Sequence, residues 1–363
     1  MADFISHPSP AARAGIVQIA EKLGVSPSTV SRALRPATAH LVREDRRREI
    51  LALAESMRFS PNPGARMLRK GVNTSLTVVV PHDENIFFSE YYGRFLSGVL
   101  HAAAARSWDV RISTNRRAPD RTLRETLQQL GRDASGVVYL AEPLTAEDLA
   151  SLQGFRRPLV LTKSALPASV DATELGLPVV GVDNRAGAKA AASLLLQLGH
   201  RRIGLVLGPD SSRDANERRQ GYTSVLTKAG VMPAAEWIYT GSFSPETGRE
   251  AALRFFQREP RPTALCCASD EIAFGVIDAA RTLGLSCPED VSVVGFDDGP
   301  WASVSRPQLT TVRQPLADLA ERAVGLIVEA ASNPGLIPRS MHTAVPAALV
   351  MRESTRSRTN GHS

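Results

Sequence analysis

The chain has 363 residues, of which 43% are hydrophobic and 22% are charged, so it can bury a large core and form more than one domain. No window approaches 18 uninterrupted apolar residues, and the first residues hold no apolar stretch long enough for an export signal. We therefore expect a cytoplasmic protein without a membrane partner.

The positive charge of the chain is concentrated near its N-terminus. Residues 1–73 contain 12 Lys or Arg residues and 6 Asp or Glu residues, whereas the remaining 290 residues contain 31 of each. A basic segment of this kind is typical of a surface that binds a polyanion such as nucleic acid. The alternative is a basic solvated tail without a partner.

Residues 16–59 carry a helical periodicity that predicts three short helices. In the string "GVSPSTVSRALR", Pro27 follows Ser26, which is suited to capping a helix, and proline is tolerated at the first helical position. A helix from 27 to about 35 then places Val30, Ala33 and Leu34 on one face and leaves the other face polar and basic.

The preceding stretch "IVQIAEKLGV" predicts another helix, with Gly24 in the turn between the two. A helix, a short glycine-bearing turn and a second helix with a polar outer face is a helix-turn-helix arrangement, whose second helix can enter a DNA major groove. Arg32 is suited to a guanine edge, and Ser28 or Ser31 to a base edge or a phosphate. The alternative is an ordinary pair of packed helices.

From Leu76 onward, short apolar runs alternate with segments of helix length. Runs bounded by Gly, Pro or Asp suit parallel strands buried on both faces, and this pattern predicts an α/β fold. The runs are "LTVVVP", "DASGVVYLA", "RPLVLT", "RIGLVLG", "TALCCAS" and "VSVVGFDD".

The strings "VQIAEKLGVSPSTVSRAL", "GVDNRAGA", "LGHRRIG", "ASDEIAFG", "PEDVSVVGFDD" and "LTTVRQP" stand in an order that resembles the lactose/galactose repressor (LacI/GalR) family. The resemblance covers about residues 15–355 and implies a dimeric transcriptional regulator with a two-lobed, periplasmic-binding-protein-like effector domain. It places Pro27, Ser28 and Arg32 on bases and Thr29 and Ser31 on phosphates.

The same resemblance makes "PNPGARML" a hinge helix, in which Ala65, Arg66 and Leu68 contact DNA and Leu68 wedges into the minor groove. Two helical turns do not persist alone, and Gly64 weakens them further, so this helix should form only on DNA. The alternative is a flexible linker without DNA contacts.

The domain boundaries follow from these assignments. We expect the DNA-binding domain at 15–60, the hinge at 61–73 and the effector domain at 74–355, followed by a disordered tail at 356–363. Within the effector domain, the first lobe should comprise about 74–182 and 314–340, and the second lobe about 183–313 and 341–355.

Ligands of two-lobed α/β domains bind between the lobes, near the carboxyl ends of strands. The expected effector-binding residues therefore end strands or open the following helices, and Arg218 and Asp297 resemble the family's residues for hydroxyl or carboxylate groups. The set is Phe87, Phe88, Lys163, Asp214, Arg218, Phe243, Ser269 and Asp297.

Some of these positions have other interpretations. Phe87 and Phe88 have a core position as their alternative, and Asp270 is expected to cap the helix "EIAFGVIDAAR" rather than touch a ligand. Ser269 replaces the asparagine common in the family. Lys163, with Arg116 and Arg117, suggests an anionic effector such as a sugar acid, whereas a neutral sugar would leave Lys163 exposed.

Enzyme signatures are missing from the sequence, which has no GxSxG, HExxH, Walker or dinucleotide fingerprint. Asp297 and Asp298 are adjacent at a strand end, so their side chains should point apart rather than form a catalytic pair. The seven histidines do not cluster, and Cys266, Cys267 and Cys287 are expected to be buried thiols, so no metal or cofactor is expected.

The sequence therefore predicts a ligand-responsive repressor of sugar or sugar-acid metabolism genes, with no enzymatic activity. It should bind a pseudo-palindromic DNA operator as a homodimer, and effector-induced lobe rotation should alter its DNA affinity. The rival, a sugar-binding receptor without DNA function, should lack residues 15–73.

Overall fold

The structure, a computed structural model, describes residues 15–34, 36–57, 59, 73–82, 86, 89–116, 121–257, 259–333 and 342–358. The chain divides between residues 71 and 72 into two compact units.

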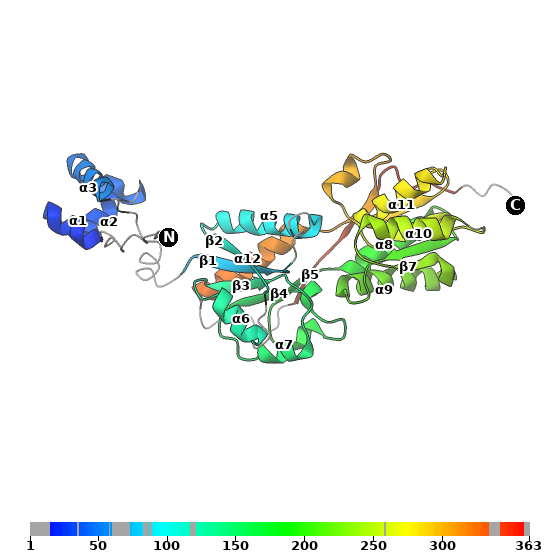
Figure 1. The fold of residues 1–363 in the computed structure, drawn as a ribbon, viewed down its shortest axis with the longest axis horizontal. Coiled ribbons are helices and arrows are strands. Elements are labelled where there is room, and N and C mark those ends of the chain that lie inside the picture. Colours follow the sequence, from blue (N-terminus) through cyan, green and yellow to red (C-terminus); the bar gives the residue numbers. More distant parts are fainter. Residues whose placement is uncertain are drawn as a thin grey trace, which may run out of the picture. The chain divides into compact units, whose positions relative to one another are not determined.

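The small unit is helical, as the periodicity of residues 16–59 predicts (Figure 1). Its elements are α1 (Ile16–Leu23), α2 (Pro27–Ala33), the 3-10 helix η1 (Pro36–Leu41) and α3 (Glu44–Ser56). Each α-helix contributes two buried residues to one apolar core: Ile19, Ala20, Val30, Ala33, Ile50 and Ala54. Because this core consumes the apolar faces of all three helices, their polar faces remain at the surface.

The large unit is built on two sheets of the α/β type. The first sheet has the order β11-β5-β4-β3-β1-β2 and the second the order β12-β10-β9-β8-β6-β7. The first comprises β1 (Ser75–Val80), β2 (Asp109–Thr114), β3 (Gly136–Tyr139), β4 (Leu159–Thr162), β5 (Val179–Val182) and β11 (His342–Val345). The second comprises β6 (Ile203–Leu207), β7 (Ile238–Thr240), β8 (Ala264–Cys267), β9 (Ser292–Asp297), β10 (Thr310–Arg313) and β12 (Ala348–Val350).

All described strand pairs are parallel except that of β10 with β12, and each sheet is covered on both faces. In the first lobe α5 (Glu90–Ala104) and α12 (Leu316–Ser332) cover one face, and α6 (Leu123–Leu130) and α7 (Ala146–Ser151) the other (Figure 1). In the second lobe α10 (Pro245–Phe256) and α11 (Asp270–Thr282) cover one face, and α8 (Asn184–Gln197) and α9 (Arg213–Lys228) the other. The short 3-10 helices are η2 (Lys163–Ala165), η3 (Ala172–Glu174), η4 (Ala235–Trp237) and η5 (Pro300–Ser303).

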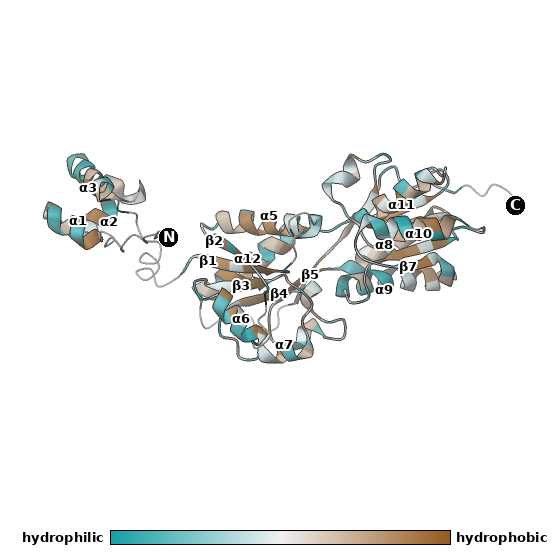
Figure 2. Ribbon diagram, in the orientation of Figure 1, coloured by the Kyte–Doolittle hydropathy of each residue, from teal (hydrophilic) through white to brown (hydrophobic). Residues whose placement is uncertain are grey.

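Burial on both faces explains why the central strands consist of continuous apolar runs. Successive residues of β1 enter different cores: Val78 packs with α5 and α12, whereas Val79 packs with α6. Figure 2 shows these strands in the brown of hydrophobic residues, whereas the helices carry both colours. The six strands expected from their apolar runs are all present, as β1, β3, β4, β6, β8 and β9.

The described chain passes between the lobes three times: from β5 to α8, from β10 to α12 and from β11 to β12. The expected lobe boundaries need one correction here, because residues 341–355 were assigned to the second lobe. Strand β11 instead pairs with β5 at the edge of the first sheet, with Val345 opposite Val182. Only the part from β12 onward belongs to the second lobe.

The expected disordered tail at 356–363 is also corrected in part. Arg356 N donates to Ser292 Oγ at 3.1 Å and Arg358 N donates to Leu198 O at 2.7 Å, so residues 356–358 are fixed to the second lobe. Residues 359–363 lie outside the described residues.

The three cysteines are free thiols, and burial raises the pKa of Cys287 to about 12. Among the described helices, none is both long and apolar enough to span a bilayer.

Candidate functional site

Helix α2 begins as the sequence predicts. Ser26 Oγ accepts a hydrogen bond from Thr29 N at 3.1 Å, and Pro27 is the first helical residue. Gly24 makes the turn from α1 with a φ of +61°, a backbone conformation that glycine adopts without steric cost. The proline therefore initiates the helix.

The two faces of α2 differ as expected. Val30 and Ala33 are buried in the helical core, whereas Ser28 and Arg32 are exposed. Ser28 Oγ lies 2.7 Å from Ser26 Oγ, so its hydroxyl stays close to the helix start. Among the described residues, the Arg32 side chain has no ion-pair partner, and it remains free to contact a molecule outside the chain.

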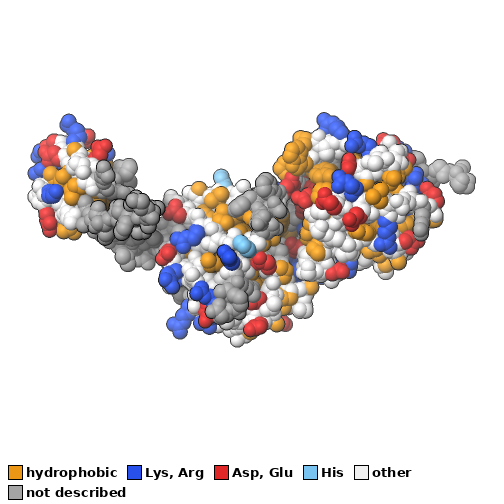
Figure 3. All heavy atoms as spheres, viewed as in Figure 1, with side chains coloured by type: hydrophobic (Ala, Val, Ile, Leu, Met, Phe, Trp, Pro, Cys, Tyr) orange, Lys and Arg blue, Asp and Glu red, His pale blue; other side chains and the backbone are white. Residues whose placement is uncertain are grey.

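The end of α2 is held by the elements that follow it. Thr38 Oγ1 donates to Arg32 O at 3.1 Å and Arg47 Nε of α3 donates to Ala33 O at 3.4 Å. These donors satisfy carbonyls that the end of a helix leaves without intrahelical partners. The helix is thus fixed at both ends with its polar face outward. Figure 3 shows side chains of the small unit, with Lys and Arg in blue.

Several expected site residues cannot be placed. The predicted DNA-contacting residues of the hinge, Ala65, Arg66 and Leu68, and the predicted effector-binding residues Phe87 and Phe88 lie outside the described residues.

In the large unit, Arg218 of α9 is the most enclosed cation near the ends of the strands, with 3% of its surface exposed. Its Nε donates to Asn184 Oδ1 at 2.9 Å and its Nη1 donates to Ala268 O at 2.5 Å. The guanidinium also lies over the Phe296 ring, 3.9 Å from its centroid, and 5.7 Å from that of Phe243. These contacts leave a rigid, oriented positive group at the carboxyl end of the second sheet.

Asp297 lies beside this guanidinium, with Oδ1 3.7 Å from Arg218 Nη1. It ends β9 with a φ of +132°, and Asp298 follows with a φ of +54°. Two consecutive non-glycine residues with positive φ form a strained turn, which commonly marks a functional site. Burial raises the pKa of Asp297, although the Arg218 guanidinium opposes the shift.

The two lobes meet at this turn. Arg94 of α5, in the first lobe, donates through Nη1 to Asp297 O at 2.9 Å, and Gln314 Nε2, in the segment that returns to the first lobe, donates to Asp297 Oδ1. Glu90 of α5 lies against Gly299 of the second lobe. Within the described residues, Gln314 Oε1 and Glu90 Oε1 are buried without a hydrogen-bond partner. We call the site formed by the following residues the lobe junction: Glu90, Arg94, Asn184, Arg218, Glu271, Asp297 and Gln314.

Asp298 has different partners from Asp297, as expected for adjacent side chains that point apart. Its carboxylate accepts hydrogen bonds from Arg313 Nε at 2.6 Å and from Arg352 Nη2 at 2.5 Å. Burial acts to raise the pKa of Asp298, but the hydrogen bonds and charges of the two arginines together outweigh it and lower that pKa. This carboxylate is therefore occupied in holding β10 to the segment after β12.

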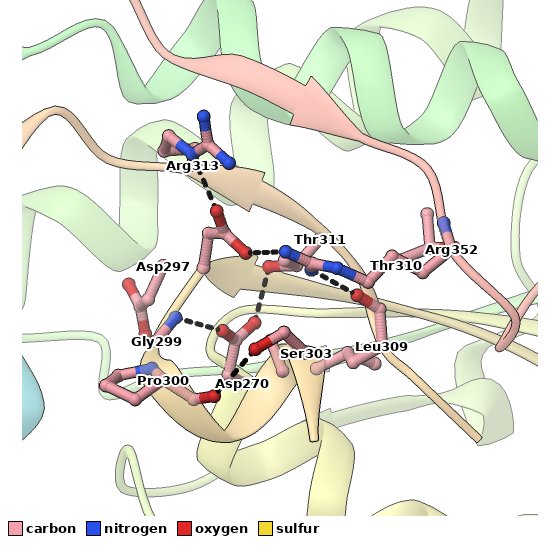
Figure 4. A network of polar contacts seen from close by, with 12 residues as sticks. Asp270, Asp297, Gly299, Pro300, Ser303, Leu309, Thr310, Thr311, Arg313 and Arg352 are labelled. Carbon is pink, nitrogen blue, oxygen red and sulfur yellow. Dashed lines mark hydrogen bonds and ion pairs between the residues drawn. The ribbon is translucent and has the colours of Figure 1, made fainter. Parts of the chain in front are cut away.

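Asp270 does not cap α11, contrary to our expectation. Ser269 is the capping residue, because its Oγ accepts from Ile272 N at 3.1 Å, and Asp270 is the first helical residue. The Asp270 carboxylate instead accepts hydrogen bonds from Gly299 N at 2.9 Å and from the Thr311 hydroxyl (Figure 4). It thereby fixes the turn that follows Asp297.

Lys163 is not the unpaired cation that we expected for an anionic ligand. Its Nζ lies 2.8 Å from Oε2 of Glu217, and these side chains are only 12% and 9% exposed. Arg213 shares the Glu217 carboxylate at 3.3 Å and donates to the carbonyl of Pro167 at 2.8 Å. Because Lys163 and Pro167 belong to the first lobe and α9 to the second, this cluster links the lobes.

Of the two arginines proposed as companions of Lys163, the described one lies apart from it. Arg116 is exposed and lines a separate hollow beside α6 with Arg121, and Arg117 lies outside the described residues. Asp214 accepts from Asn184 Nδ2 at 2.9 Å, and burial raises the pKa of its carboxyl group.

Sequence reasoning missed several members of the lobe junction. Asn184 bridges Asp214 and Arg218 and stands in the quoted string "GVDNRAGA", and Gln314 stands in "LTTVRQP", so both motifs held a signal that was not read as a site. Glu90 and Glu271 had no such signal. Burial, and then the charge of Asp297, raise the pKa of Glu271 to about 7.

Comparison with known proteins agrees with this architecture. A model of the periplasmic-binding-protein-like domain matches residues 192–355. The chain is 30% identical to the transcriptional repressor PurR of Mannheimia succiniciproducens over 87% of this chain and 91% of that protein. It is 28% identical to catabolite control protein A of Priestia megaterium, over 94% of this chain and 99% of that protein.

Among solved structures, the lac repressor dimer bound to operator and an anti-inducer is similar in fold, with a TM-score of 0.77 and 22% identity over 94% of this chain and 99% of that one. The match to PurR covers 318 residues. Together with the capped helix α2, the two-lobed α/β unit and the lobe junction, it shows that this chain belongs to the LacI/GalR family of transcriptional regulators.

Proposed function

We propose that this chain represses transcription by binding a pseudo-palindromic operator as a homodimer, with α2 as the recognition helix in the major groove. In this proposal Ser28 and Arg32 contact base edges, Pro27 offers an apolar contact, and Thr29 and Ser31 bind phosphates. The observation that carries the proposal is the side chain of Arg32, which is exposed and has no ion-pair partner among the described residues. This side chain stands on a helix whose two ends are fixed by hydrogen bonds.

The hinge completes the DNA contact in this proposal. Ala65 and Arg66 of one hinge helix pack against DNA, and Leu68 inserts into the minor groove. Paired apolar wedges of this kind unstack a base step and bend the duplex, so a flexible pyrimidine–purine step is expected at the operator centre.

The effector is proposed to bind at the lobe junction, where Arg218, Asp297 and Gln314 present charged and polar atoms. Gln314 Oε1 is a buried acceptor without a partner in the described part of the chain, and a ligand hydroxyl or amine would satisfy it. Phe243, half-buried beside Arg218, offers an aromatic face to a sugar ring. Ser269 and Asp214 line the same strand ends, although each already has a hydrogen-bond partner.

The charges at the junction favour a neutral polyhydroxylated effector over a sugar acid. Lys163 and Arg213 share the Glu217 carboxylate, and the Asp214 carboxyl group is close enough to interact with both cations, so the two positive charges already face two carboxyl groups. Glu90 and Asp297 add negative charge beside the buried acceptor. An anionic effector would therefore have to displace an ion pair, whereas a hydroxyl-rich ligand would fill open hydrogen bonds.

Binding would change how the two lobes meet, and the lobe rotation would reach the hinge through the segments that join them. A coupling of this type is typically worth about 1–3 kcal/mol. The contacts of Arg94 with Asp297 and of Lys163 with Glu217 already join the lobes, and a rotation of the lobes would break them.

Electrophoretic mobility shift with operator fragments selected from random DNA tests the proposal. The full chain should bind with nanomolar to micromolar affinity, and a chain of residues 74–363 should not. Arg32→Ala should weaken binding by about tenfold or more and relax the preference for one base, a loss expected for a bidentate base contact.

Lys22→Ala is the matched control, because it removes the same charge from exposed α1 of the same unit. It should weaken binding to all sequences by the same small factor. Equal binding by the full chain and the truncated chain would refute the assignment of α2.

A further inference from the structure

The second lobe has another hollow at the amino ends of its parallel strands, whereas the lobe junction lies at their carboxyl ends. Its volume is about 440 Å³. Its walls include Arg202, Thr263 and Asp290, which stand just before β6, β8 and β9, whereas Ser269 and Asp297 lie at the carboxyl ends of the same sheet. The hollow is therefore separate from the effector site proposed above.

The described lining of this hollow contains four arginines and three acidic residues. Four arginines line it: Arg202, Arg261, Arg356 and Arg358. Arg261 pairs with Glu259 at 3.5 Å. The side chains of the other three have no ion-pair partner among the described residues.

Two of the three carboxylates in the described lining of the hollow accept hydrogen bonds from nearby backbone amides. Glu259 accepts from Arg261 N at 3.1 Å in addition to its ion pair, and Asp290 Oδ2 accepts from Ser286 N at 2.8 Å. Glu289 is the remaining acidic side chain in the lining. Beyond the Arg261–Glu259 pair, three guanidinium groups therefore face the two carboxylates of Glu289 and Asp290, so the lining keeps an excess of positive charge. Lys and Arg are balanced by Asp and Glu over residues 74–363 as a whole.

A buried histidine fixes the backbone that presents two of these arginines. His200 is 3% exposed, and burial lowers its pKa, so the ring is neutral near pH 7. Nε2 then donates to Arg356 O at 3.2 Å, and Nδ1 accepts from the Thr263 hydroxyl at 3.0 Å. With Arg358 N bonded to Leu198 O, the C-terminal segment is anchored at two points on the rim.

We propose that this hollow binds a small phosphorylated metabolite carrying at least two negative charges. Guanidinium groups donate paired hydrogen bonds to phosphoryl oxygens, and three of those in the hollow have no ion-pair partner within the described part of the chain. The volume is within the range of small-molecule sites. Pro288 is the one apolar residue in the described lining, so the hollow suits a phosphorylated polyol rather than an aromatic base.

Isothermal titration of the full chain with inorganic pyrophosphate tests this proposal. One pyrophosphate should bind per chain, and Arg202→Ala and Arg356→Ala should each weaken binding by about tenfold, as expected for the loss of a charge-assisted contact. Arg254→Ala is the control, because Arg254 is exposed on α10 of the same lobe and does not line the hollow. It should bind as the unmodified chain does.

Two further measurements complete the test. Each variant must unfold at the same temperature as the unmodified chain, and a neutral sugar bound at the lobe junction must not compete with pyrophosphate. Equal affinity of all three variants would place the anion elsewhere, for example on the basic helical unit, and would overturn the proposal. Equal affinity for citrate would overturn the phosphoryl assignment.

Discussion

Arg218→Met removes the guanidinium from the lobe junction and keeps a side chain of similar length. Two charge-assisted hydrogen bonds are lost, to Asn184 and to Ala268, each worth about 1.5–3 kcal/mol. Burying an apolar side chain in place of a desolvated cation offsets part of this loss. We expect the large unit to lose about 3 kcal/mol of stability near pH 7.5.

The loss should depend on pH through Asp297. Burial already raises the pKa of its carboxyl group and Arg218 opposes that shift, so removing Arg218 raises the pKa further. At pH 5 more of the carboxyl group is protonated in the folded variant, and less uncompensated charge is buried. The deficit of the variant should therefore be smaller at pH 5 than at pH 7.5.

Urea denaturation followed by tryptophan fluorescence measures this in the full chain, because Trp108, Trp237 and Trp301 all lie in the large unit. Arg219→Met is the matched control on the next residue of α9. Its ion pair with Asp210 is at the surface, and its loss should cost less than about 1 kcal/mol. An unchanged midpoint for Arg218→Met, or an equal deficit at both pH values, would refute this reasoning.

Three further predictions concern single contacts. Ser26→Ala should cost the small unit about 1 kcal/mol and speed hydrogen exchange at the Thr29 amide, and unchanged exchange would contradict the cap. Glu271 has a folded pKa of about 7, above its ordinary value of 4.5, so its stabilising contribution is complete below pH 4.5 and is lost as the pH rises through 7. Relative to the unmodified chain, the free energy of unfolding of Glu271→Gln should therefore be about 1–2 kcal/mol higher at pH 8 than at pH 4.5, after allowance for a half-exposed side chain. A difference in urea midpoints that does not change with pH would contradict this. In a double-mutant cycle, Lys163→Met and Glu217→Gln should show a coupling of about 1–3 kcal/mol, and strictly additive losses would show that the pair does not hold the lobes together.

Much of the fold could be predicted because the relevant signals are local. Ser26, Pro27 and Thr29 together specify the start of a helix, and the buried strands are visible in the sequence as runs of Val and Leu. Strands β7 and β12 were less visible, since they are edge strands of three residues whose side chains are only partly buried. Their pairing depends on the rest of the sheet.

The site could be predicted only in part, because it depends on contacts between distant residues. Lys163 looked free in the sequence, and its partner Glu217 lies 54 positions away on the other lobe. Either Ser269 or Asp270 could have capped α11. In the structure Ser269 is the cap, and the Asp270 carboxylate instead accepts a hydrogen bond from Gly299 N in the turn after Asp297. Such choices are made by tertiary packing, which single-residue propensities do not contain.

In the proposed function, a small molecule bound at the lobe junction controls how tightly the helical unit binds DNA. This is measured directly as the dissociation constant of the full chain for its selected operator, by fluorescence anisotropy, with and without the neutral sugar that most raises the thermal midpoint of the large unit. We expect a change of about 5- to 150-fold in the unmodified chain and a much smaller change in Arg218→Met. An operator affinity that is the same with and without a sugar shown to bind at the junction would contradict it.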